Sequence, residues 1–161
     1  MKKIIVIQAI GLLLTSLCVN ALAEDLPKSG SFNIQSISKA YAPVKFNDDY
    51  THNTATGVTF NEKGSGPLHL GKSACSISSL TRKDINKVIG FCNFEDKDGD
   101  SIFVQYSGKS NAKGEFSGEN DIIGGTGKFK GISGNGPVAC ANTDKKGEFP
   151  CTQQFDYQLP E

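Results

Sequence analysis

The side chains with the clearest chemistry in this chain of 161 residues are its cysteines. Cys18 lies in an apolar N-terminal segment, and the other four are Cys75, Cys92, Cys140 and Cys151. Four cysteines in an exported domain are typical of two disulfides, for which three connectivities exist. A polar, turn-like stretch separates Cys75 from Cys92, and another separates Cys140 from Cys151. We therefore expect the disulfides Cys75–Cys92 and Cys140–Cys151, each across one antiparallel hairpin.

The alternative use of these cysteines is a zinc site completed by His52 and His69. Zinc sites use closely spaced pairs such as CxxC or HxxxH, and the chain has neither. The two histidines are also the only side chains that titrate near neutral pH without a large pKa shift, and no GxSxG nucleophile motif is present. The sequence thus predicts no metal site, no catalytic residue and no cofactor, and we interpret both histidines as surface or rim residues.

The acidic segment 96–100 (DKDGD) has the composition of a calcium loop, because hard cations prefer clustered carboxylates. An EF-hand loop has glycine at its sixth position and glutamate at its twelfth. Here Gly99 is fourth and Ser107 is twelfth, so we interpret the segment as a solvated hairpin turn.

The glycine-rich segment 124–129 (GGTGKF) has the composition of a phosphate-binding loop. Such a loop needs glycine five residues before its Gly-Lys pair and serine or threonine directly after it. Ile122 and Phe129 occupy these two positions. We interpret the segment as a structural turn, in which glycine permits positive φ angles. The structural turn residues that we predict are Gly99, Gly124, Gly125 and Gly127.

An export signal is predicted over residues 1–23. Two lysines precede an almost entirely apolar run over residues 4–17, and Ala21 and Ala23 suit cleavage before residue 24. The alternatives are an uncleaved anchor, for which the run is short, and a lipoprotein acylated on Cys18, which has a bulky residue before it. We expect an exported protein, either periplasmic or secreted.

Removal of residues 1–23 leaves 138 residues and takes away two lysines but no acidic residue, so the formal charge changes from zero to −2. This length suits one domain, and we expect a flexible leader over residues 24–31 and a single domain over 32–161. The near-neutral balance argues against general attraction to nucleic acid or to an anionic membrane. No later apolar run is long enough to span a membrane as a helix.

Alternation of apolar and polar residues dominates the rest of the chain, for example over residues 115–122 and 154–159. Alternation means one wet face and one buried face, which is typical of antiparallel sheet. Turn-forming residues interrupt the pattern often, and seven to nine short strands of this kind indicate a barrel or a sandwich. The one segment compatible with a helical turn is 81–87.

One hairpin is predicted in detail. Matching its apolar faces pairs Phe94 with Ile102 and Cys92 with Val104, and it leaves residues 97–99 as a three-residue loop. Such loops end in a left-handed residue, and Gly99 adopts that conformation without a Cβ clash.

Residues 124–134 (GGTGKFKGISG) resemble the GGTGxFxxxxG signature of the allene oxide cyclase and dirigent-like β-barrels, and the acidic turn at 96–100 is similar to that of bacterial members. The resemblance extends in layout over residues 55–159. It implies an all-β, antiparallel eight-stranded barrel with an apolar cavity, stapled here by two disulfides. Members include an oxylipin-epoxide cyclase and proteins that direct phenol coupling, whereas the exported bacterial members that this chain resembles most have no assigned activity. Since the matching motif is a turn, no catalytic residue is carried over.

We expect the barrel to bind a small apolar or amphipathic ligand, because an eight-stranded barrel is just wide enough either to fill itself or to hold one small molecule. The alternatives are an isomerase or cyclase acting in the same cavity, and a secreted interaction or inhibitor module with a filled barrel. Oligomeric state is not predicted. The candidate lining residues share an expected inward face: Val58, Phe60, Phe94, Ile102, Val104, Tyr106, Phe116, Asn120, Phe155 and Tyr157.

The export signal makes the first testable prediction. We expect the exported protein to begin at Glu24, because the apolar run ends just before two small residues suited to signal peptidase. Intact mass measurement of the exported protein checks this. A mass that includes residues 1–23, or a lipid on Cys18, would contradict it.

Overall fold

The structure is a computed structural model that describes residues 26–161 except residues 84 and 144. The predicted export signal, its cleavage point and Cys18 lie outside the described residues. The described part forms nine strands and one 3-10 helix, which are in chain order β1 (Ser29–Ala40), β2 (Val44–Lys45), β3 (Tyr50–Asn61), β4 (Gly71–Arg82), β5 (Ile85–Glu95), β6 (Ser101–Ser110), β7 (Phe116–Gly125), η1 (Gly127–Phe129), β8 (Ser133–Cys140) and β9 (Glu148–Gln158).

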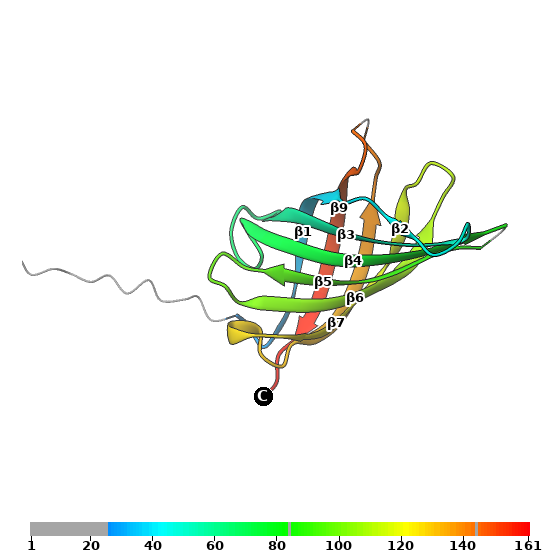
Figure 1. The fold of residues 1–161 in the computed structure, drawn as a ribbon. Coiled ribbons are helices and arrows are strands. Elements are labelled where there is room, and N and C mark those ends of the chain that lie inside the picture. The colour runs from blue at the N-terminus through cyan, green and yellow to red at the C-terminus, as the bar shows by residue number, and fades with distance from the viewer. Residues whose placement is uncertain (1–25, 84, 144) are drawn as a thin grey trace, which may run out of the picture.

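The strands form one closed antiparallel barrel (Figure 1). From β3 to β9 each strand pairs with the next, and β1 pairs with both β9 and β3, so eight strands complete the circle while β2 adds two residues beside the start of β3. The predicted all-β eight-stranded barrel is confirmed. The leader was expected to reach residue 31, but β1 already pairs with β9 from Ser29 onward.

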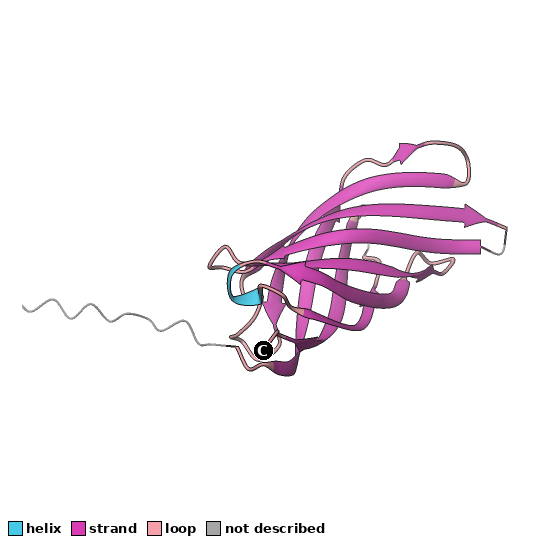
Figure 2. Ribbon diagram, turned by 90° about the horizontal axis from the view of Figure 1, so that it is seen from below, coloured by secondary structure: helices cyan, strands magenta, loops and turns pink. Residues whose placement is uncertain are grey.

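The two ends of the barrel differ. The plugged end carries both termini of the described chain and the connections 62–70, 96–100 and 126–132, the last of which contains η1 (Figure 2). The open end carries the connections 41–49, 83–84, 111–115 and 141–147. In Figure 1 the plugged end lies at the lower left and the open end at the upper right.

Large apolar side chains fill the plugged end. Ile34, Ile102 and Phe155 point inward from the strands, and each is 0% exposed. Leu68 and Phe129, from two of the plugged-end connections, are equally buried and close the barrel over them. Burial of such side chains contributes about 1.5–3 kcal/mol each, so this half holds the main hydrophobic core.

A buried ion pair links the three connections of the plugged end. The Asp96 carboxylate accepts a hydrogen bond from the Leu68 amide at 3.0 Å and lies 3.3 Å from Lys128 Nζ. The same ammonium group is 2.9 Å from Asp98 Oδ2, and the Lys128 amide donates to Asp100. The lysine of the GGTGKF segment is therefore neutralised by the acidic turn. This arrangement supports the interpretation of both segments as structural turns.

The hairpin of β5 and β6 has the predicted register. Cys92 pairs with Val104 and Phe94 with Ile102, and Gly99 has a φ of 88° at the end of the loop. Both predicted disulfides, Cys75–Cys92 and Cys140–Cys151, are also present. Each joins directly opposed residues, the first on β4 and β5 and the second on β8 and β9.

The helical turn considered for residues 81–87 is wrong. This segment is the tip of the β4–β5 hairpin, where Arg82 pairs with Ile85. Its polar composition reflects exposure at a hairpin tip, and the short helix η1 lies instead inside the glycine-rich segment.

Replacement of Lys128 by methionine tests the ion pair. The change leaves the Asp96 carboxylate buried without its cation, so we expect the free energy of unfolding to fall by on the order of 2–3 kcal/mol. Lys130→Met, an exposed lysine in the same connection, is the control and should have little effect. Equal losses in chemical denaturation of the two variants would contradict the role of Lys128.

The ion pairs of Lys128 with Asp98 and Asp96 also predict how the stability of the protein depends on pH. A hydrogen bond and the charge from Lys128 lower the pKa of Asp98, so its contribution is lost as the pH falls through that lowered value. Burial alone would lower the pKa of Lys128, but Asp98 and Asp96 raise it overall, so that contribution is lost as the pH rises through the raised value. The stability difference between wild type and Lys128→Met should therefore be constant from about pH 5 to pH 9 and shrink outside that range.

Gly127 provides a separate test of the glycine turn. Its φ is 53°, and a Cβ there would lie 1.7 Å from an Asp100 carboxylate oxygen, so Gly127→Val should cost on the order of 1–3 kcal/mol. Gly99→Val is the matched control, because Gly99 also has positive φ but no atom within 4 Å of an added Cβ. Thermal melts should show a larger loss for Gly127→Val, with no effect of inorganic phosphate. An unchanged melt, or stabilisation by phosphate, would contradict the structural interpretation.

Candidate functional site

The half of the barrel at the open end contains a cavity of about 220 Å³. Its inward positions carry small side chains where the plugged end carries phenylalanine and isoleucine: Ser36 and Ser38 on β1, Ala55 on β3, and Ser73 and Ser79 on β4 all line it. For scale, an apolar cavity of about 150 Å³ accommodates benzene. The space is therefore suited to a molecule of one ring with a few substituents.

One wall of the cavity is aromatic, and two glycines make room for its rings. Tyr106 on β6 and Phe116 on β7 lie with ring centroids 5.7 Å apart. A Cβ on Gly90 would be 2.3 Å from the Tyr106 ring, and a Cβ on Gly118 would be 2.8 Å from the Phe116 ring. Because these glycines have no side chain, the rings occupy the space against the barrel wall and leave the centre open.

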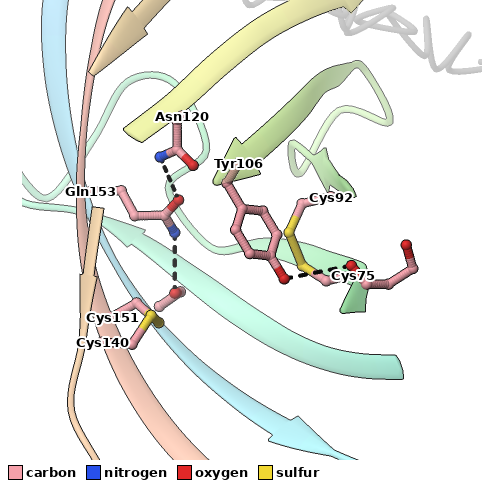
Figure 3. Close-up of a disulfide and its surroundings, with 9 residues drawn as sticks. Cys75, Cys92, Tyr106, Asn120, Cys140, Cys151 and Gln153 are labelled. Carbon is pink, nitrogen blue, oxygen red and sulfur yellow. Dashed lines mark hydrogen bonds between the residues drawn. A yellow bond between two sulfur atoms is a disulfide. The ribbon is translucent and has the colours of Figure 1, made fainter. Parts of the chain in front are cut away.

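A chain of buried polar groups runs along the inner wall from β7 through β9 to β1 (Figure 3). The Asn120 amide on β7 donates to Gln153 Oε1 at 3.0 Å, and Gln153 Nε2 donates to Ser36 Oγ at 3.3 Å. Ser73 Oγ, which is buried on β4, has no hydrogen-bond partner. A buried hydroxyl without a partner is costly, and a ligand hydroxyl or carbonyl would remove that cost.

The described residues that line the cavity include no aspartate, glutamate, lysine, arginine or histidine. The group among them with a titratable side chain is Tyr106, and burial raises the pKa of its hydroxyl well above the ordinary value of 10.0. This hydroxyl is therefore protonated at neutral pH, with only a long contact of 3.5 Å to the Ser76 carbonyl oxygen. An uncharged lining strongly disfavours a charged ligand, because burial of an unpaired charge is costly.

The two disulfides line the cavity as well. Cys75–Cys92 lies near Tyr106, and Cys140–Cys151 lies beside Gln153 (Figure 3). Each joins the two strands of one hairpin beside the cavity, and Cys92 also belongs to the hydrophobic core cluster. The covalent links hold neighbouring strands together where the barrel wall borders the cavity.

The predicted lining residues fall into three groups. Phe94, Tyr106, Phe116 and Asn120 line the cavity as expected. Four others face inward but belong to the plugged core, and these are Ile102, Val104, Phe155 and Tyr157. The remaining two, Val58 and Phe60, do not face inward.

The inward orientation expected for Val58 and Phe60 is wrong, since they are 45% and 38% exposed. The inward residues of β3 are instead Ala55 and Thr59, which are buried. Register explains the difference: Ala55 pairs with Cys75, whose disulfide faces the interior. Because side chains alternate along a strand, inward Ala55 requires outward Val58 and Phe60.

Sequence reasoning missed most of the polar lining, including Ser36, Ser73 and Gln153. Ser36 continues the alternating row of Phe32 and Ile34 on β1, and this row was the available signal. The histidines lie elsewhere. His52 Nδ1 is 3.1 Å from Ser78 Oγ, and the His69 ring contacts that of Phe60.

Of the predicted turn residues, Gly127 has positive φ in the turn, whereas Gly124 and Gly125 are the last two residues of β7 and Gly125 has no positive φ. Gly125 is needed for a close approach instead, because its Cβ would lie 2.6 Å from the Phe129 carbonyl oxygen.

Among the described residues, no group of three or more His, Cys, Asp or Glu side chains is arranged to hold a metal ion. No helix in the described ranges is long and apolar enough to cross a membrane.

Comparison with known proteins adds no assignment to this geometry. No protein family model matches the chain, and no curated protein is significantly similar to it in sequence. The functional inference therefore rests on the cavity itself.

Proposed function

We propose that this barrel binds one small, uncharged and largely apolar molecule in the cavity of its open half. The observation that carries the proposal is the contrast between the two halves of one interior. Large side chains fill the plugged half, whereas serines, alanine and glycine-backed rings surround a space of about 220 Å³ in the other. Ligand sites of this kind combine apolar walls with a few placed polar groups, and here Ser73 and Tyr106 are such groups.

The cavity also bears on the two alternatives. A filled barrel that acts only through its outer surface would have no such space. An isomerase or cyclase needs a group that moves a proton, and the described lining offers only a tyrosine whose pKa is raised. Binding is therefore the function that these side chains support best.

Two further proposals accompany this one. The eight-stranded barrel, with GGTGKF at the end of β7 and in the turn that follows it, supports membership in the allene oxide cyclase and dirigent-like group. The two disulfides support a site of action outside the reducing cytoplasm, in the periplasm or the medium.

Calorimetric titration with a one-ring probe tests the binding proposal. We expect uncharged para-cresol to bind at one saturable site, and the anionic para-methylbenzoate to bind at least tenfold more weakly, because its charge would be buried without a partner. Tyr106→Ala should weaken binding of the uncharged probe by removing part of the aromatic wall. Absence of saturable binding, or a preference for the anionic probe, would contradict the proposal.

A matched pair of variants locates the site. Ala55→Phe places a large ring in the cavity and should abolish probe binding, whereas Thr54→Phe places the same ring on the outer face of the same strand and should leave binding unchanged. Thermal melts confirm that both variants are folded. Equal effects of the two substitutions would show that the probe binds outside the barrel.

A further inference from the structure

The charges of the barrel are separated between its ends, although their sum is near zero. All four open-end connections carry exposed basic residues at or beside them: Lys45 in the first, Arg82 and Lys83 in the second, Lys113 in the third, and Lys145 and Lys146 in the fourth. Nearby strand ends add Lys39, Lys87 and Lys109, and Lys87 lies directly opposite Lys109.

Acidic residues only partly offset these charges. The open end has nine basic residues against six acidic ones, namely Asp48, Asp49, Asp84, Glu115, Asp144 and Glu148, of which Asp84 and Asp144 are counted from the sequence alone. Its net charge is +3, and the rest of residues 26–161, with six basic and nine acidic residues, carries −3. The overall balance that argued against an anionic partner therefore does not describe this end.

Exposed apolar side chains lie at the same end. The connection 41–49 presents Val44 and Phe46, which are 58% and 65% exposed. The Phe46 ring packs against Tyr50, with centroids 5.2 Å apart, which holds it at the rim. Ile85, at the tip of the β4–β5 hairpin, is 43% exposed. The open end thus combines an apolar rim with basic residues on every connection.

We propose that the open end docks on the surface of an anionic membrane. Apolar side chains at the interface and lysines at the headgroups are the two contributions that hold peripheral proteins on such surfaces. An anionic bilayer is a continuous negative surface. It can contact all four connections together, because they lie at the same end of the barrel (Figure 1). Docking itself does not depend on the proposed function, but its purpose does. In the docked protein the mouth of the cavity would face the bilayer, in which an apolar ligand dissolves.

Sedimentation with vesicles tests the docking. We expect the protein to sediment with vesicles that contain phosphatidylglycerol and not with pure phosphatidylcholine vesicles, and added salt should release it. Lys145→Gln with Lys146→Gln should weaken binding about fivefold for each charge removed. The same changes at Lys63 and Lys130, near the plugged end, are the control and should have no effect.

Phe46→Ser should weaken docking about tenfold, whereas Phe60→Ser, an exposed aromatic residue on the outer face of β3, should not. Equal binding to both vesicle types, equal effects of rim and control variants, or binding to DNA in preference to vesicles would overturn the proposal. Ala55→Phe separates the two proposals, because it should lose the probe but keep docking. Wild type that docks without binding the probe refutes only the binding function, and wild type that binds the probe without docking refutes only this inference.

Discussion

The width of the barrel interior is the constraint on which the rest of this structure depends. Eight strands enclose a space just large enough for side chains to fill, so the size of each inward residue decides whether a position is solid or hollow. Ile34, Ile102 and Phe155 fill one half, whereas Ser38 and Ala55 leave the other half open. Both the candidate site and the core follow from one alternating row of residues on each strand.

The two halves are stabilised by different interactions. Packing and the Asp96–Lys128 ion pair hold the plugged end, where three connections converge. At the open half, where a cavity replaces packing, two disulfides join neighbouring strands instead. The cysteines, the acidic turn and the glycine-rich segment resemble chemical sites in the sequence. In the structure they form the disulfides and the ion pairs that stabilise the barrel.

The pairing of neighbouring strands within a hairpin could be predicted from the sequence. Which side chains of a strand face the barrel interior could not always be predicted. The β5–β6 register and both disulfides could be predicted because each depends on residues within one hairpin. The apolar character of Val58 and Phe60 predicts that they face inward. The face that they occupy is set instead by the pairing of Ala55 on the same strand with Cys75, whose disulfide faces the interior. The residue type serine gives no signal of burial, so only the alternating row of Phe32 and Ile34 on the same strand indicates that Ser36 faces inward. Net charge is a sum over the whole chain, and it therefore cannot show how charge is distributed between two ends.

The position of β1 has a consequence for the order of folding. This strand closes the barrel by pairing with β9, which is the last of the described strands in chain order. Hairpins such as β4–β5 form from neighbouring residues, but the circle cannot close until β9 has been synthesised. Such non-local closure is slow. In a chain of this topology β1 therefore stays without its β9 partner until all the strands between them have been synthesised.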